Sequence, residues 1–191
     1  MSESEGTSDG DRVLAGDAHV AQASSPADSA KSAQAAYRRY LPHLQRSGKP
    51  VFISFATWNR KTLPERVRQL VLDCVVTGHG VRFSLHAAVI MPDHVHVLLT
   101  PMSDEHGETY GIAQIMHAIK GASAHAVNNA LGHSGRVWQP ESFDHVLRSD
   151  DSIRQKAEYI CANPVRAGLV ASENDWPWLW REWVEGRREA L

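Results

Sequence analysis

Two histidines separated by one valine, His94 and His96, are the residues best suited to bind a metal ion. They begin an apolar run, residues 94–100, that predicts a β-strand. Side chains alternate along a strand, so both imidazoles point to one face and Val95 points to the other. Two neutral imidazoles on a rigid strand can bind one divalent cation. A pair of hydrogen-bonded histidines near a strand end is the alternative that this short motif leaves open.

A tyrosine and an asparagine, Tyr159 and Asn163, form the second candidate group. On a helix, residues four apart lie on the same face, so a phenol and an amide would emerge side by side. A neutral phenol is a weak nucleophile, since its ordinary pKa is about 10. A metal ion on a phosphate substrate would compensate by making the phosphorus more electrophilic. The alternative is a surface tyrosine and an asparagine that ends a helix before Pro164.

The periodicity of the chain predicts strand, helix, strand, strand, helix, strand and a final helix. This is the split βαβ order of a ferredoxin-like α+β domain, an antiparallel sheet with helices on one face, here with an extra C-terminal helix that carries Tyr159. The other sheet face would then be available for a site. The predicted elements are strands at residues 51–58, 83–90, 94–100 and 138–147, and helices that begin near residues 62, 112 and 150.

The first helix has both a start signal and an apolar face. Thr62 is a candidate cap, and Glu65 stands three residues later, as in a capping box. Pro64 is tolerated in a first turn. The predicted apolar face has helical spacing and consists of Val67, Leu70, Val71, Cys74 and Val75.

Charge divides the chain into three parts. Residues 1–36 hold six acidic and two basic residues and no aromatic residue, which predicts a disordered acidic tail. Residues 37–170 form the predicted catalytic domain, and within it residues 37–68 hold eight basic residues against one acid. Such a segment suits a phosphate backbone, although a solvated basic face is equally compatible. Residues 171–191 form a Trp-rich segment, in which Trp176, Trp180 and Trp183 have the spacing of one helical face.

The composition excludes several classes of protein. The chain has 191 residues and only two cysteines, Cys74 and Cys161, so neither a cysteine zinc cluster nor a disulfide scaffold is expected. There is no apolar run long enough to span a membrane and no visible secretory signal. No P-loop or nucleophile-elbow motif is present. These features fit a reducing, cytoplasmic compartment.

Three sequence blocks in register resemble the signature of the REP-associated tyrosine transposases, a branch of the single-tyrosine, His-hydrophobic-His transposases. An earlier segment, YRRYLPH at 37–43, is also similar to the start of this branch, and the resemblance extends over about residues 37–180. The three blocks are MPDHVHVLL at 91–99, WQPESFDHVLR at 138–148 and YICANPVRAGLV at 159–170.

The resemblance implies an activity and its residues. The histidine pair would bind Mg²⁺ or Mn²⁺, and Asn163 stands at the place of a polar third ligand, where many relatives have glutamine. Tyr159 would attack a phosphodiester of single-stranded or hairpin DNA, become joined to the 5′ phosphate and free a 3′ hydroxyl. Lys120 matches a lysine often found in the family. The expected DNA-binding residues are Arg38, Arg39, Arg60, Lys61 and Lys120, with Asp144 and His145 as candidate proton acceptors.

Other interpretations remain open from sequence alone. A domesticated relative could bind hairpin DNA through the basic segment without cutting it, in which case binding would survive loss of the histidines. A histidine-triad nucleotide hydrolase would need a third histidine at position 98, where the chain has Leu98. A nucleoid-associated monomer and a homodimer with shared active sites are both compatible with the resemblance.

Overall fold

The computed structural model describes residues 48–147 and 151–182 of the chain. Within these ranges no helix is long and apolar enough to cross a membrane. The predicted boundary at residue 36 and Arg38 and Arg39 lie outside the described residues. The elements, in chain order, are β1 (Val51–Ala56), η2 (Trp58–Arg60), α2 (Glu65–Val76), β2 (Phe83–Ile90), β3 (His94–Pro101), α3 (Ile112–Leu131), β4 (Phe143–Val146), α4 (Asp151–Cys161), α5 (Asn163–Arg166), η3 (Glu173–Asp175) and β5 (Leu179–Arg181).

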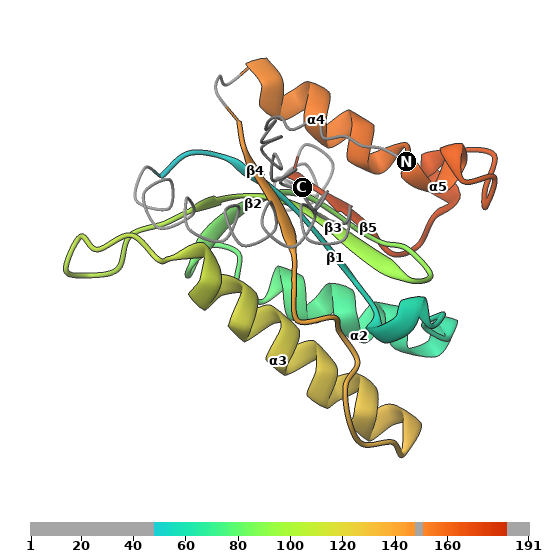
Figure 1. Cartoon of the computed structure of the whole chain (residues 1–191). Helices are drawn as coiled ribbons and strands as arrows, with labels where there is room; N and C mark the ends of the chain where they lie inside the picture. Colours follow the sequence, from blue (N-terminus) through green and yellow to red (C-terminus); the bar gives the residue numbers. More distant parts are fainter. Residues whose placement is uncertain (1–47, 148–150, 183–191) are drawn as a thin grey trace, which may run out of the picture. The chain divides into compact units, whose positions relative to one another are not determined.

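The five strands form one antiparallel sheet in the order β4-β1-β3-β2-β5. The first four strands have the order of a split βαβ domain, so the predicted α+β fold is confirmed. Helices α2 and α3 cover one face of the sheet, whereas α4 and α5 lie on the other (Figure 1).

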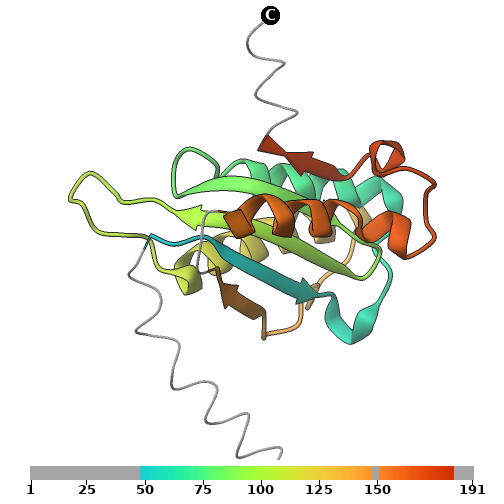
Figure 2. The same cartoon turned by 90° about the horizontal axis from the view of Figure 1, so that it is seen from above.

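Alternation along the strands produces a buried cluster on each face. Val95, Val97 and Leu99 of β3 point into the larger cluster, which α2 and α3 cover. Leu98 points to the opposite face and joins a smaller cluster with Ala157 and Ile160 of α4. Figure 2 shows α4 crossing above the middle of the sheet, with β4 at one edge. Burial of Ile160 therefore fixes the position of the helix that carries Tyr159.

Helix α2 begins differently from the prediction. Its cap position is Pro64, with no side-chain cap hydrogen bond, so the predicted capping box of Thr62 and Glu65 is wrong. Pro64, with φ −55° and ψ 145°, is the last non-helical residue before Glu65. Its buried face includes Leu72 and Arg68, while Leu70 is only half-buried.

The structure of the C-terminal Trp-rich segment also differs from the prediction. Trp176 follows η3, and Trp180 lies in the strand β5, so the predicted helical face is wrong for these two residues. Trp183 lies outside the described residues. β5 extends the sheet by pairing with β2. The expected packing onto the domain is present, because the buried Trp176 donates its indole N–H to the Ile90 carbonyl, 3.1 Å away.

Candidate active site

The two histidines lie where β3 begins, on the face that carries α4. The neighbouring Val95 is fully buried in the opposite cluster, which confirms the predicted alternation. The centroids of the His94 and His96 rings are 4.7 Å apart. Ser54 of β1 and Val89 of β2 flank His96 in the sheet. The two rings are close enough to bind one ion, because metal–nitrogen bonds are about 2 Å long.

His94 is oriented by a carboxylate and an arginine. Its Nδ1 lies 2.6 Å from Oδ1 of Asp93, and the other oxygen of Asp93 accepts a hydrogen bond from Arg60, 3.2 Å away. Burial raises the pKa of Asp93, but the hydrogen bonds and positive charges of His94 and Arg60 outweigh it and lower this pKa. An ionised carboxylate on Nδ1 leaves Nε2 of His94 for a metal, which is the usual support of a metal-binding histidine.

His96 lacks such a partner. Its Nδ1 is buried and has no hydrogen bond within the described part of the chain. Burial, assisted by the charges of His94, Lys156 and Arg60, lowers the pKa of His96 to about 4. The ring is therefore neutral near pH 7, as a metal ligand must be.

The donor set fits a hard divalent cation only with further oxygen ligands. Among residues 48–147 and 153–182, no three His, Cys, Asp or Glu side chains come together in a way that could hold a metal ion. Two imidazoles and one amide oxygen leave positions open for phosphate oxygens or water. Asn163 is the candidate amide.

Asn163 lies just after the end of the helix that carries Tyr159. Helix α4 ends at Cys161 and α5 begins at Asn163, so the alternative of an asparagine at the end of a helix before Pro164 describes this position. Pro164 explains the break. The Asn163 Nδ2 donates to the carbonyls of Tyr159 and Ile160, at 3.1 and 2.9 Å. Its nitrogen thus caps α4, and its Oδ1 is the atom that remains for a ligand.

Tyr159 projects from α4 with 46% of its surface exposed. Lys156 connects it to the histidines: its Nζ lies 4.8 Å from the Tyr159 ring centroid and 3.9 Å from that of Phe52. The Phe52 ring is in turn 5.4 Å from His96. Tyr159, Lys156, Phe52, His96 and His94 therefore form one continuous row of contacts, which we call the site row.

Arg166 lies against the same phenol. Its Cζ is 4.4 Å from the Tyr159 ring centroid. A hydrogen bond and the charge of Arg166, followed by the charge of Lys156, lower the pKa of Tyr159. A lowered pKa increases the phenolate fraction and so favours nucleophilic attack.

An exposed aromatic ring extends the site row toward the sheet edge. Phe143 of β4 is 54% exposed, and its ring is 6.2 Å from Phe52. Asp144 follows Phe143 in β4 and pairs with Ile53, so its side chain points to the other face of the sheet, which α2 and α3 cover. The alternation therefore separates Asp144 from Tyr159, whereas the exposed His145 shares the face of Phe143.

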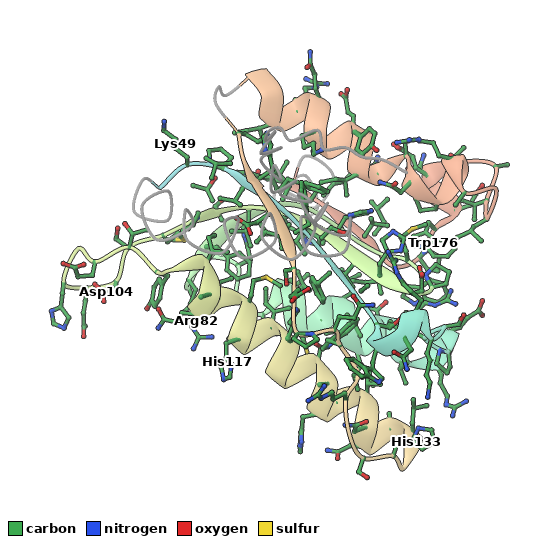
Figure 3. All side chains as sticks on the ribbon, viewed as in Figure 1. Lys49, Arg82, Asp104, His117, His133 and Trp176 are labelled. Carbon is green, nitrogen blue, oxygen red and sulfur yellow. The ribbon has the colours of Figure 1, made fainter. Side chains whose placement is uncertain are left out.

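Two of the basic residues have internal partners. Lys120 of α3 is half-buried and donates to the carbonyls of Gln139, Pro140 and Glu141 within 3.3 Å, so its three donors are used by this loop. Figure 3 shows His117, another residue of α3, on the side of the sheet away from α4, so the helix that carries Lys120 lies on the face opposite to Tyr159.

The other basic residues differ in exposure. Arg68 is buried, and its guanidinium lies 4.6 Å from the Trp178 ring. Arg60 and Lys61 are exposed, and Arg60 lies beside the histidines through its hydrogen bond to Asp93.

Comparison with known proteins identifies the family. The family model described as "Transposase IS200 like" matches residues 56–162. The chain belongs to the IS200-like transposase family. The match contains His94, His96 and Tyr159 and ends one residue before Asn163.

Relatives of this IS200-like transposase agree with that assignment. The chain is 30% identical over 96 residues to the REP-associated tyrosine transposase of Escherichia coli (strain K12), an alignment that covers 50% of this chain and 52% of the relative. It is 27% identical over 101 residues to a related protein of Haemophilus influenzae, covering 50% of this chain and 57% of that one. The chain thus spans about half the length of the curated relatives it matches.

A solved structure extends the similarity. A REP-associated tyrosine transposase bound to a REP hairpin matches with a TM-score of 0.55 and 26% identity, over 75% of this chain and 80% of that one. The resemblance to this branch is thereby confirmed.

Proposed function

We propose that this chain is a metal-dependent endonuclease and strand-transferase that cleaves single-stranded DNA beside a hairpin, with Tyr159 as the nucleophile. The observation that carries the proposal is the site row, in which a phenol with a lowered pKa lies on the same sheet face as two paired imidazoles. Membership in the IS200-like transposase family supports a reaction on DNA, and the hairpin bound by the similar structure supports this substrate class.

The reaction exchanges one ester bond for another. The phenol oxygen of Tyr159 forms a bond to phosphorus, the bond from phosphorus to the 3′ oxygen breaks, and the proton lost by the phenol ends on the departing 3′ hydroxyl through water. The phosphodiester keeps its single negative charge. Attack by a new 3′ hydroxyl on the phosphotyrosine reverses the exchange and joins strands, so neither step needs a nucleotide cofactor.

His94, His96 and Oδ1 of Asn163 would hold Mg²⁺ or Mn²⁺, which when bound would polarise the scissile phosphate and stabilise the leaving oxygen. Asp93 holds the His94 ring in its tautomer and orientation. Burial keeps His96 neutral. Lys156 and Arg166 favour the phenolate. On the open half of this face, the exposed ring of Phe143 offers a stacking surface to an unpaired base.

Denaturing gels test this function. Labelled single-stranded hairpin DNA incubated with the protein and Mn²⁺ should yield an upstream fragment with a free 3′ hydroxyl and a downstream fragment linked to the protein through its 5′ phosphate. Both products should disappear on addition of a chelator and in Tyr159→Phe, whose ring preserves the packing. An adduct formed by Tyr159→Phe would contradict the assigned nucleophile, and hairpin binding without cleavage by the native protein would favour a non-catalytic DNA-binding protein.

A further inference from the structure

Two cations contact the ring of one exposed tyrosine. Lys156 comes from α4, three residues before Tyr159, and Arg166 comes from the end of α5. The Lys156 nitrogen and the Arg166 guanidinium carbon lie 4.8 and 4.4 Å from the Tyr159 ring centroid. The break at Ala162, between α4 and α5, separates the two cations along the chain, yet both reach the same phenol.

Neither cation has an acidic partner in the part of the chain that the structure describes, whereas their neighbours do. Arg154, two residues before Lys156, pairs with Glu158 at 3.1 Å. Arg60 pairs with Asp93 at 3.2 Å. No carboxylate of residues 48–147 or 153–182 lies within ion-pair distance of Lys156 or Arg166. Two like charges held against one ring repel each other, and an anion placed between them would relieve this repulsion.

The chemistry of the surroundings indicates which anion. The ring between the cations is that of the nucleophile in the proposed function, on which this inference rests. A phosphodiester under attack by this phenol has two non-bridging oxygens that carry its charge. Arginine binds such oxygens through its planar fork of donors, and lysine binds them as a point charge.

We propose that Lys156 and Arg166 contact the non-bridging oxygens of the scissile phosphate and stabilise its charge during attack by Tyr159. They are then catalytic residues in addition to the metal ligands and the nucleophile.

The test compares single-turnover cleavage of hairpin DNA at saturating protein with the affinity for the same DNA. Lys156→Met and Arg166→Met keep the aliphatic stems that pack on the rings but remove the charges. Each should lower the saturated rate by about a hundredfold, as loss of a transition-state charge contact does, while affinity changes by less than about threefold. Arg166→Lys should recover part of the rate, because it restores the charge without the fork.

Arg154→Met is the matched control, since it removes an exposed cation of the same helix that already has a carboxylate partner. It should cleave within about twofold of the native rate. Native-like saturated rates for the two methionine variants would overturn the inference and leave the proposed function intact, as would a loss confined to affinity. A native protein that forms no adduct would overturn both, and equal melting temperatures of all variants would show that they fold.

Discussion

The ionisation of His96 links the site to the stability of the fold. Burial and nearby positive charges lower its pKa to about 4, below the ordinary value of about 6.5. Between these values the unfolded chain binds more protons than the folded one, so folding becomes less favourable as the pH falls. The stability conferred by a neutral His96 is complete above pH 6.5 and is lost as the pH approaches 4.

In metal-free protein, this shift predicts a loss of about 2 kcal/mol of unfolding free energy between pH 7 and pH 5 that is specific to His96. Urea denaturation in the presence of a chelator measures it. His96→Leu should remove this part of the pH dependence, whereas substitution of the exposed His106 should not. Parallel pH profiles for the native protein and His96→Leu would contradict the assignment.

Lys120 illustrates a basic residue whose role is structural. Its ammonium group donates to three successive carbonyls of the loop before β4, and burial lowers its pKa. Lys120→Met keeps the stem but leaves these carbonyls without their donor. We expect a loss of about 1–3 kcal/mol in urea unfolding.

The exposed Lys61 provides the comparison, since Lys61→Met should change stability by less than about 0.5 kcal/mol. A Lys120→Met protein as stable as the native one would show that the loop does not depend on this contact.

At the scale of single residues, the sequence was sufficient to predict side-chain directions that follow from strand alternation. It was not sufficient to predict contacts that arise when helices pack on the sheet. The common face of His94 and His96 follows from strand geometry alone. Asp93 could have been recognised as the support of His94, because it directly precedes this residue. Lys156 and Arg166 carry no such signal: their contact with Tyr159 depends on the break after Cys161 and on the position of α4 over the sheet.

At the scale of elements, the end of α2 packs directly against β2. A Cβ added to Gly78 would lie 2.4 Å from the ring of Phe83, which is buried in the core. Gly78→Ala should therefore force the ring or the turn to move and cost about 1–3 kcal/mol. Thermal or urea unfolding measures this loss.

Gly121→Ala is the opposite case. Gly121 lies within α3, and a Cβ there meets nothing within 4 Å. This substitution should stabilise the protein by about 0.5–1 kcal/mol, because alanine favours a helix more than glycine does. A Gly78→Ala protein as stable as the native one would contradict the packing described for Gly78, and a destabilised Gly121→Ala protein would contradict the open surroundings of Gly121.

The elements themselves were predictable to different degrees. β2 has the predicted bounds and the start of β3 is as predicted, since turn residues 91–93 separate two strongly apolar runs. Gly132 ends α3 in the left-handed conformation, as a glycine stop should. β5 was missed because its three residues acquire their strand geometry only by pairing with β2. The buried Ser123 faces the core from α3, where its hydroxyl accepts a hydrogen bond from the Trp138 indole N–H, a contact between two residues that are distant in sequence.

At the scale of the whole molecule, the basic residues do not act as one surface. Arg68 and Lys120 are held by internal contacts, whereas Arg60 and Lys61 are exposed at the end of the sheet that carries the histidines. Lys61→Ala should weaken binding of single-stranded hairpin DNA of any sequence and reduce the salt dependence of log affinity by about 0.7, the contribution of one phosphate contact. Fluorescence anisotropy over a salt series measures both quantities.

The exposed Arg82, which precedes β2 at the opposite end of the sheet (Figure 3), is the matched control. Arg82→Ala should leave affinity and salt dependence unchanged. Equal effects of the two variants would show that DNA affinity depends on the net charge of the protein and not on the distance of a basic residue from the histidines.

The central claim is that one chain supplies both the nucleophile and the histidine pair. The most direct measurement mixes Tyr159→Phe protein with His96→Ala protein and assays cleavage of hairpin DNA with Mn²⁺. Lys156 and Phe52 connect Tyr159 to His96 of the same chain. Neither variant alone nor their mixture should therefore cleave the DNA. Cleavage restored in the mixture would mean that Tyr159 acts on the histidines of another copy, and would contradict this account.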